Sequence, residues 1–329
     1  MANIGAAIIG TGSCLPEKVL TNFDFEKILD TSDEWITTRT GIKKRHVCSD
    51  EESTVDIGVK AARAALDSAC LTPDKIDLII TATFTPDMPL PSASCLIQQK
   101  LGIKNCGAFD LAAACSGFIY ALSTATQFIK TGVYKNVLVI GAEAITRFTD
   151  YKDRGSCILF GDGAGAVVLS AVNETDRGVQ YTKLAADGEG WPLLFIPGGG
   201  SKKPASAATL ENRDHYIKMQ GREIYKFAVT KMQSLIEDAM QQCNLTVDDV
   251  AMIVPHQVNQ RIIDSACSHL GFPGEKVFVN IDQTGNTSSA SIPIALDQAM
   301  QSGKVKKGDT IIMVAFGAGL TWASSVIKM

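Results

Sequence analysis

The sequence predicts an α/β fold built from two copies of one unit. In each half, apolar strand patterns alternate with helical patterns in the order strand, helix, strand, helix, strand. The strand pattern at 250–257 repeats the one at 76–83. Gly132 follows Cys115 by 17 residues, and Gly303 follows Asn286 by 17, so we expect Cys115 and Asn286 to occupy equivalent turns. This order indicates two sheets that are mostly covered by helices.

Composition is typical of a globular protein with a large core. The 329 residues are 46% hydrophobic and 20% charged, and the net charge of -4 gives no reason to expect nucleic-acid binding. No segment is long and apolar enough to span a membrane. The apolar N-terminus lacks a preceding basic region and Pro16 follows it closely, so we expect a first strand rather than a signal peptide.

Cysteine and histidine usage indicates a reduced compartment without zinc. The nine cysteines are scattered, with no CxxC pair, and the four histidines have no metal-ligand spacing near them. We therefore expect a cytoplasmic protein with no metal site. Gly10 and Gly12 form a lone GxG, but the third glycine of a dinucleotide site is missing and Pro16 blocks the helix that would receive the phosphates.

The first half of the chain carries signals for helices, strands and one proline-rich loop. A helix begins at Thr31 or Ser32, either of which can cap it, and acidic residues fill its first turn. Three prolines exclude regular structure from the loop before Ser92, and Gly102 closes the next helix. The other predicted elements are a helix at 54–70, strands at 76–83, 107–113 and 136–144, a helix at 118–129, and a buried strand within 160–172.

Cys115 lies where a strand should turn sharply into a helix. Three alanines precede it, and Ser116 and Gly117 follow. In that turn the thiol would point at the positive end of the helix, which favours the nucleophilic thiolate. The alternative is a small buried cysteine at an alanine-rich helix start, which is common for this residue type.

Two strand ends in the second half carry polar side chains of the kind found in active sites. His256 follows the strand at 250–257, and Asn286 follows a Gln-Thr-Gly turn. Ligands bind at the carboxyl ends of strands in such sheets, so we expect both side chains to meet Cys115. Alone, the histidine would be structural and the asparagine a turn former. Residues 185–215 are predicted to form a long surface loop or flap.

Trp35 and Arg39 lie four residues apart and thus on one face of the first helix. An exposed tryptophan beside an arginine can stack on an adenine while the guanidinium holds a phosphate. A tryptophan buried at a domain seam is the alternative.

Several motifs together resemble the β-ketoacyl-[acyl-carrier-protein] synthase III family of the thiolase superfamily. They are DLAAACSGF, VPHQVN, QTGNTSSASIP and AFGAGLTW, with TSDEWITTRTGI and RGSCILFGDGAGA elsewhere, so the resemblance covers essentially the whole chain. It implies a thiolase-like five-layered αβαβα fold of two pseudo-symmetric halves, 1–174 and 175–329, and a homodimer. It also implies an acyltransferase that starts fatty acid synthesis by joining an acyl-CoA primer to malonyl-acyl-carrier protein, with release of CO2.

The resemblance also implies residue roles. Cys115 would carry the acyl group, His256 and Asn286 would stabilise the malonyl enolate, and the backbone N–H groups of Cys115 and Gly319 would form the oxyanion hole. Coenzyme A is a substrate here, and no cofactor is implied. The residues implied in binding it are Thr31, Trp35, Arg39, Arg154 and Asn259.

Three positions depart from the family pattern. Lys226 and Arg261 match basic positions that dock the carrier protein, but Ser268 and His269 stand where a lysine pair is common. Leu90 replaces a phenylalanine that closes the partner's acyl pocket in acetyl-specific members. Primer length therefore stays open.

Three other functions compete with this one. A polyketide or alkylquinolone starter synthase would keep the cysteine, histidine and asparagine. A non-catalytic acyl-binding relative would have lost one of them, and none is lost. A 3-hydroxy-3-methylglutaryl-CoA synthase needs a catalytic glutamate, which we do not find near these motifs.

Overall fold

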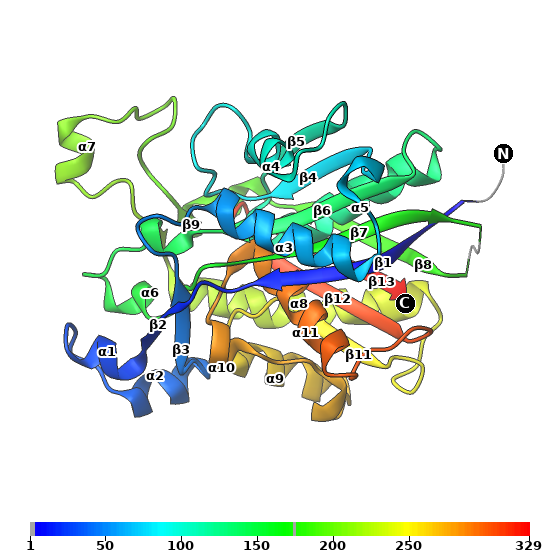
Figure 1. Ribbon diagram of the computed structural model, residues 1–329. Coiled ribbons are helices and arrows are strands. Elements are labelled where there is room, and N and C mark those ends of the chain that lie inside the picture. The colour runs from blue at the N-terminus through cyan, green and yellow to red at the C-terminus, as the bar shows by residue number, and fades with distance from the viewer. Residues whose placement is uncertain (1–3, 174–175) are drawn as a thin grey trace.

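The computed structural model describes residues 4–173 and 176–329 and contains two main sheets (Figure 1). In the five-stranded sheet β4 runs parallel to β5 and β6, while β7 pairs antiparallel with β1 and β6. Its order is β1 (Gly5–Cys14), β7 (Gly163–Val172), β6 (Asn136–Glu143), β4 (Leu78–Ala82), β5 (Gly107–Leu111). The order of the four-stranded sheet is β11 (Met252–Pro255), β12 (Thr310–Gly317), β13 (Thr321–Lys328), β8 (Gly178–Ala186).

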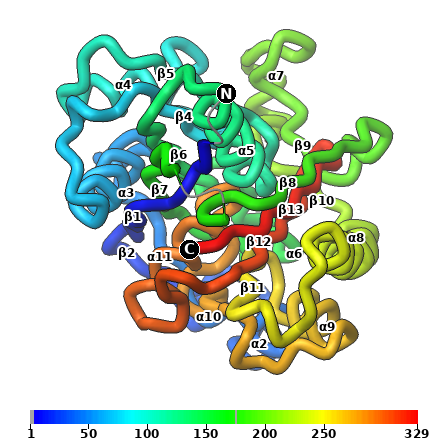
Figure 2. The backbone as a smooth tube through the Cα atoms, turned by 90° about the vertical axis from the view of Figure 1, so that its right-hand side faces the viewer, coloured from blue at the N-terminus to red at the C-terminus, as the bar shows by residue number. Residues whose placement is uncertain are grey.

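Helices cover both faces of each sheet, so that three layers of helices and the two sheets make five layers (Figure 2). The middle layer is α5 (Gly117–Lys130) and α11 (Ser291–Gln301). The outer layers are α3 (Thr54–Ser68) with α4 (Ala93–Leu101), and α8 (Gly221–Gln242) with α9 (Gln260–His269). Along β4, Leu78 and Ile80 pack into the middle core, whereas Ile79 packs against α3 and α4. The predicted αβαβα fold is confirmed, and its strands are apolar because both faces are buried.

Shorter elements connect the layers. Two of them, β2 and β3, form an antiparallel pair near α1 and α2, on the lower left of Figure 1. These elements are β2 (Lys18–Thr21), α1 (Asn22–Glu26), α2 (Asp33–Thr40), β3 (Lys44–Val47), η1 (Pro73–Lys75), η2 (Ala114–Ser116), η3 (Ile145–Phe148), α6 (Arg154–Cys157), η4 (Gly188–Leu193), β9 (Leu194–Phe195), α7 (Ala207–Glu211), β10 (Lys218–Met219), η5 (Gly274–Lys276), α10 (Ile281–Thr284) and η6 (Ser288–Ala290).

Helix ends follow the capping signals of the sequence. The Ser32 side chain accepts a hydrogen bond from the Trp35 backbone N–H and begins α2. Ser92 caps α4 in the same way, and Gly102 ends it with a left-handed φ of 72°. These two predicted helices are confirmed, and α2 presents Trp35 to the surface region discussed below.

The two copies match less closely than their spacing predicts. Their turns begin at left-handed residues, Ala114 (φ 47°) in η2 and Ser288 (φ 52°) in η6. Cys115 lies one residue after the left-handed Ala114, whereas Asn286 lies two residues before the left-handed Ser288. The predicted equivalence of Cys115 and Asn286 is therefore wrong. The spacing of 17 residues to Gly132 and to Gly303 is equal because Asn286 lies three residues earlier relative to its turn, and α11, with 11 residues, is three shorter than α5, with 14.

The strand expected before Asn286 is also reduced. Val277 makes one isolated parallel bridge to Ile253 of β11, and the chain then forms α10. Asn280, at the N-cap of α10, and Asp282 of its first turn belong to the short polar residue types that favour turns and helix starts over strands.

The region at 185–215 is more ordered than a plain loop. It contains η4, β9 and α7, and β10 then pairs antiparallel with β9. The arm that carries α7 projects at the upper left of Figure 1. The predicted boundary between the halves, at 174 and 175, lies outside the described residues. No helix within residues 4–173 and 176–329 is both long and apolar enough to cross a membrane.

Candidate active site

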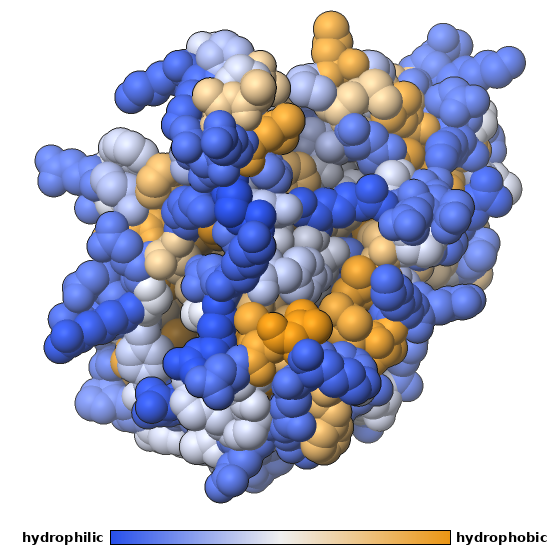
Figure 3. All heavy atoms as spheres, turned by 90° about the vertical axis from the view of Figure 1, so that its left-hand side faces the viewer, coloured by the Kyte–Doolittle hydropathy of each residue, from blue (hydrophilic) through white to orange (hydrophobic). Residues whose placement is uncertain are grey.

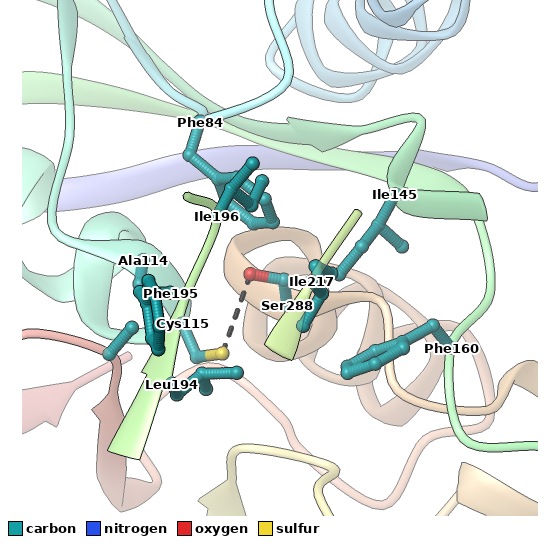
Figure 4. A pocket seen from close by; sticks show the side chains of 11 residues that line it. Phe84, Ala114, Cys115, Ile145, Phe160, Leu194, Phe195, Ile196, Ile217 and Ser288 are labelled. Atoms are coloured by element: carbon teal, nitrogen blue, oxygen red, sulfur yellow. Dashed lines mark hydrogen bonds between the residues drawn. The ribbon is translucent and has the colours of Figure 1, made fainter. Parts of the chain in front are cut away.

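Cys115 lies in η2, directly before α5 and against the end of β12. The β12 backbone approaches so closely that a Cβ on Gly317 would lie 2.6 Å from the Cys115 backbone nitrogen. The Ser288 hydroxyl donates a hydrogen bond to the Cys115 sulfur at 3.4 Å (Figure 4). Burial raises the pKa of the Cys115 thiol to about 12. Burial therefore works against the thiolate that the helix start was expected to favour, whereas the hydrogen bond from Ser288 supports it.

His256 follows β11 and is buried. Its backbone N–H donates to the Val314 carbonyl at 2.8 Å, and its Nδ1 lies 2.6 Å from the Ser291 hydroxyl. Phe316 packs edge-on against the ring, with centroids 5.8 Å apart. Desolvation lowers the pKa of His256 to about 3, so the imidazole is neutral near pH 7. Because Ser291 occupies Nδ1, Nε2 is the nitrogen left for a substrate.

Asn286 is fixed by its backbone and by its own side chain. Its N–H donates to the Leu159 carbonyl at 2.8 Å, and its carbonyl accepts from Gly161 N–H at 3.1 Å. Its Oδ1 accepts from the Ser288 backbone N–H at 2.9 Å. Since Oδ1 is engaged, the Nδ2 amide is the part of this side chain that can donate to a ligand.

The structure brings Cys115, His256 and Asn286 together. All three line one narrow cavity of about 50 Å³. This cavity shares Cys115, Phe160 and Leu194 with a cavity of about 310 Å³ on one side. It shares Leu159, Met219, Ile224 and Val258 with a cavity of about 280 Å³ on the other side. The three cavities form a path in which Cys115 stands between an inner and an outer space.

The inner cavity is apolar, and Figure 4 shows its side chains arranged around Cys115. They come from both halves of the chain and from the region around β9 and β10. The lining residues are Phe84, Ala114, Cys115, Ile145, Phe160, Leu194, Phe195, Ile196, Ile217, Ser288 and Ala318. Such walls suit an apolar chain attached to the Cys115 sulfur.

The outer cavity opens beside α2, where Trp35, Arg39, Asn259 and Arg261 line it. The Arg154 guanidinium lies 5.0 Å from the Trp35 ring centroid, and that of Arg39 lies 5.7 Å away. A base inserted between Trp35 and Arg154 needs about 7 Å, twice a contact distance, so these side chains must separate to admit one.

Of the two other residues predicted to bind coenzyme A, Asn259 lines the outer cavity and Thr31 does not. The Asn259 amide donates to the Arg39 carbonyl at 3.0 Å. The Thr31 hydroxyl oxygen is buried and has no hydrogen-bond partner among the described residues. Figure 3 shows the molecular face on this side, with hydrophobic patches among hydrophilic side chains.

The residues predicted to dock a carrier protein are exposed. Lys226 lies on α8 and pairs with Glu223 at 3.3 Å. The Arg261 guanidinium lies 5.8 Å from the ring of Tyr225, the neighbour of Lys226 in α8. Both cations therefore flank the outer mouth.

Gly319 and Leu90 complete the predicted set. Gly319 lies in the turn between β12 and β13 with a left-handed φ of 136°, close in sequence to the Gly317 backbone that contacts Cys115. Leu90 lies in the loop between β4 and α4, where 84% of its surface is exposed. It does not line the inner cavity of its own chain.

Three polar residues that support the site are not among the residues predicted from the sequence. Ser288 and Ser291 hold Cys115 and His256, and both lie in the serine-rich QTGNTSSAS stretch. Glu143, at the end of β6, is fully buried and accepts hydrogen bonds from Thr85 and Ser289 at 2.6 and 2.8 Å. Burial raises its pKa to about 7. The sequence does carry a signal for Glu143, because an acidic residue within an apolar strand pattern is unusual.

Metal ligands do not gather in the described part of the chain, where no group of three His, Cys, Asp or Glu could hold an ion.

Comparisons with known proteins point to one family. The family model 3-Oxoacyl-[acyl-carrier-protein (ACP)] synthase III matches residues 109–188, and its C-terminal model matches 240–329. The β-ketoacyl-[acyl-carrier-protein] synthase III of Caldanaerobacter subterraneus subsp. tengcongensis is 53% identical over 99% of this chain and 98% of its own.

Solved structures agree. The crystal structure of 3-oxoacyl-[acyl-carrier-protein] synthase III from Aquifex aeolicus VF5 has a TM-score of 0.91 at 48% identity, covering 99% of this chain and 100% of that chain. The priming β-ketosynthase of the R1128 polyketide pathway has a TM-score of 0.91 at 36% identity, covering 98% and 96%.

Proposed function

The chain belongs to the β-ketoacyl-[acyl-carrier-protein] synthase III family, and from this premise we propose how its residues divide the reaction. It is an acyltransferase, the condensing enzyme that initiates fatty acid synthesis. It joins an acyl-CoA primer to malonyl-acyl-carrier protein and yields 3-oxoacyl-carrier protein, CO2 and CoA. The observation that carries the residue roles is the common cavity of Cys115, His256 and Asn286.

In the first half-reaction, the Cys115 sulfur attacks the thioester carbonyl of the primer. The backbone N–H groups of Cys115 and Gly319 hold the oxyanion, and collapse of the intermediate expels CoA, which leaves as the thiol with the proton from Cys115. The nucleotide of CoA lies at the outer mouth, against Trp35 and Arg154. The acyl chain extends into the apolar inner cavity.

In the second half-reaction, malonyl-carrier protein loses CO2 and becomes an enolate. His256 Nε2–H and Asn286 Nδ2–H donate hydrogen bonds to the thioester oxygen on which that negative charge develops. The low pKa of His256 supports this role, because a neutral imidazole donates without releasing a full proton. The enolate carbon then attacks the acyl carbonyl, and the Cys115 sulfur leaves as a thiolate that takes up a proton from water before the next cycle.

The family and the exposed basic residues support a proposal for the partners and the oligomeric state. The carrier protein docks at Lys226 and Arg261, next to the outer mouth. The enzyme acts as a homodimer in the cytoplasm, where Leu90 reaches the partner's acyl pocket. Its chemistry needs no cofactor beyond the two thioester substrates.

A starter synthase of polyketide synthesis is the second candidate, favoured by the similarity to the R1128 priming enzyme. Both enzymes form the same acyl-cysteine, so the carrier protein distinguishes them. Comparing condensation rates on the fatty-acid and polyketide carrier proteins of the same organism decides between the two.

The test of the proposed function is direct detection of the acyl-enzyme. The protein is incubated with acetyl-CoA or hexanoyl-CoA, digested, and analysed by mass spectrometry. We expect the acyl mass on the Cys115 peptide, no acylation in Cys115→Ala, and 3-oxoacyl-carrier protein after malonyl-carrier protein is added. Acylation of another residue, or of none, contradicts the proposal.

A further inference from the structure

One wall of the inner cavity belongs to a segment that we call the strap, residues 194–219 from β9 to β10. It contributes Leu194, Phe195, Ile196 and Ile217 to the lining. Figure 4 shows that two of these side chains project into the cavity. Ile196 lies beside Phe84, and Ile217 lies next to Ile145 and Phe160. The position of the strap therefore sets the space for the acyl chain.

The strap has little regular structure of its own to fix this position. Its strands β9 and β10 are joined by only two residue pairs, Phe195 with Lys218 and Leu194 with Met219. Between them the chain runs out to the exposed arm that carries α7 (Figure 1). A two-residue ladder is too short to hold a wall rigidly, so side-chain contacts to the body of the protein matter.

Asp150 contacts two strap residues, one before Ile217 in the sequence and one after it. The Arg213 guanidinium donates two hydrogen bonds to its carboxylate, one of them from Nε to Oδ2 at 3.1 Å. Lys218 Nζ lies 3.8 Å from the same Oδ2. Between these two cations, the Ile217 backbone N–H donates to the Phe148 carbonyl at 2.8 Å.

Asp150 itself belongs to the wall next to the strap, because Ile145 of that wall and Ile217 of the strap share one apolar cluster with Phe160. It follows η3, the short helix that carries the cavity residue Ile145, and the Lys152 backbone N–H donates to its Oδ1 at 2.9 Å. Its side chain is 8% exposed, while that of Arg213 is 33% exposed. The hydrogen bonds from Arg213 lower the pKa of Asp150 to about 2, so the pair stays charged at neutral pH. A bidentate pair of this kind, with the carboxylate buried and the guanidinium partly exposed, has defined geometry.

We propose that Asp150 is a positioning residue for primer length, because its ion pair with Arg213 fixes the strap and hence how closely Ile217 packs against Ile145 on the adjoining wall. The inference rests on the proposed function, since it concerns the acyl chain on Cys115. Asp150 touches no substrate. Releasing the strap leaves Cys115, His256 and Asn286 in place and gives longer or branched acyl groups room that the tethered wall denies them.

The test compares kcat/KM for acetyl-, butyryl-, isovaleryl- and hexanoyl-CoA in wild type, Asp150→Asn, Arg213→Ala and the double variant. Lys203→Ala is the matched control, because it removes an ion pair within the same strap, to Asp214 at 2.5 Å, that does not involve Asp150. We expect the hexanoyl-to-acetyl ratio to rise about fivefold in each single variant, with no further rise in the double variant, as for two residues that act through one contact. Lys203→Ala keeps the wild-type ratio.

Three results overturn the proposal: unchanged ratios in both single variants, additive effects in the double variant, or an equal rise in Lys203→Ala. Arg213 is partly exposed, so Arg213→Ala serves as the decisive variant if Asp150→Asn does not fold. A wild type that no acyl-CoA acylates refutes the proposed function itself. An acylated wild type with unaltered variant profiles refutes only the role of Asp150.

Discussion

The hydroxyl of Ser288 lies 3.4 Å from the sulfur of Cys115, although the two residues are 173 positions apart. The same residue donates its backbone N–H to Asn286 Oδ1 at 2.9 Å. Ser288 thus links the nucleophile of one half to the amide of the other. Its hydrogen bond lowers the pKa of a thiol that burial raises, so it favours the reactive thiolate.

Replacing Ser288 by alanine should slow acylation of Cys115. The loss of one hydrogen bond to the developing thiolate, about 1–1.5 kcal/mol, predicts a rate about tenfold lower at neutral pH. Ser288→Gly is the matched variant, because glycine suits the left-handed φ of 52° and also lacks the hydroxyl. Both variants should be equally slow in acyl transfer from labelled acyl-CoA. Normal acylation in Ser288→Gly would assign the effect of alanine to backbone strain.

Much of the fold, and the meeting of Cys115, His256 and Asn286 in one cavity, could be predicted from the sequence. Apolar strands buried on both faces, together with caps such as Ser32 and Gly102, carry enough local signal. Cys115, His256 and Asn286 stand out because each follows a strand pattern, and strands of an α/β sheet end at one edge.

Other features depend on tertiary contacts and carry no local signal. The equal spacing to Gly132 and Gly303 conceals a helix three residues shorter in the second copy. The charge state of Cys115 depends on burial by distant segments, which a helix-start pattern does not reveal. The ion pair of Asp150 with Arg213 joins residues 63 positions apart, and nothing in the sequence around either residue points to the other.

Trp35 and Arg154 should contribute mainly to the binding of CoA. Contacts to a remote nucleotide are the same in ground and transition states, so Trp35→Ala and Arg154→Ala should raise KM for acyl-CoA by about tenfold and change kcat little. Steady-state kinetics with acetyl-CoA measures both constants. A lower kcat at unchanged KM would make these residues structural. The KM for malonyl-carrier protein is the internal control.

Leu90 should permit primers longer than acetyl. Leucine is smaller than the phenylalanine of acetyl-specific relatives, and each buried methylene of a primer contributes about 0.8 kcal/mol where there is room. Overpacking costs about 1–3 kcal/mol, so Leu90→Phe should shift preference back towards acetyl-CoA. The measurement is kcat/KM for acetyl-, butyryl-, hexanoyl- and octanoyl-CoA on both forms. A wild type confined to acetyl-CoA, or identical profiles, would refute this expectation.

Glu143 should make stability fall as pH rises through neutrality. Burial raises its pKa from an ordinary 4.5 to about 7 in the folded protein. Between these values the folded state keeps a proton that the unfolded state releases, so the free energy of unfolding falls with pH. Relative to Glu143→Gln at the same pH, the wild type should lose about 3 kcal/mol between pH 4.5 and pH 8.

Urea unfolding at pH 4.5, 5.5, 6.5 and 8 measures this difference. His256 acts in the opposite direction, because its lowered pKa makes stability fall as pH drops below about 6.5. Both proteins keep His256, so its contribution cancels in the comparison. Parallel curves for wild type and Glu143→Gln would show that Glu143 does not titrate in this range.

Cys115 should serve acyl transfer, whereas His256 and Asn286 should serve decarboxylation. The most direct test measures both half-reactions, acylation from labelled acyl-CoA and CO2 release from labelled malonyl-carrier protein, in Cys115→Ser, His256→Ala and Asn286→Ala. We expect Cys115→Ser to lose acylation. His256→Ala and Asn286→Ala should still be acylated but release CO2 at least about a hundredfold more slowly. Loss of acylation in His256→Ala would contradict the claim and make His256 the general base for Cys115.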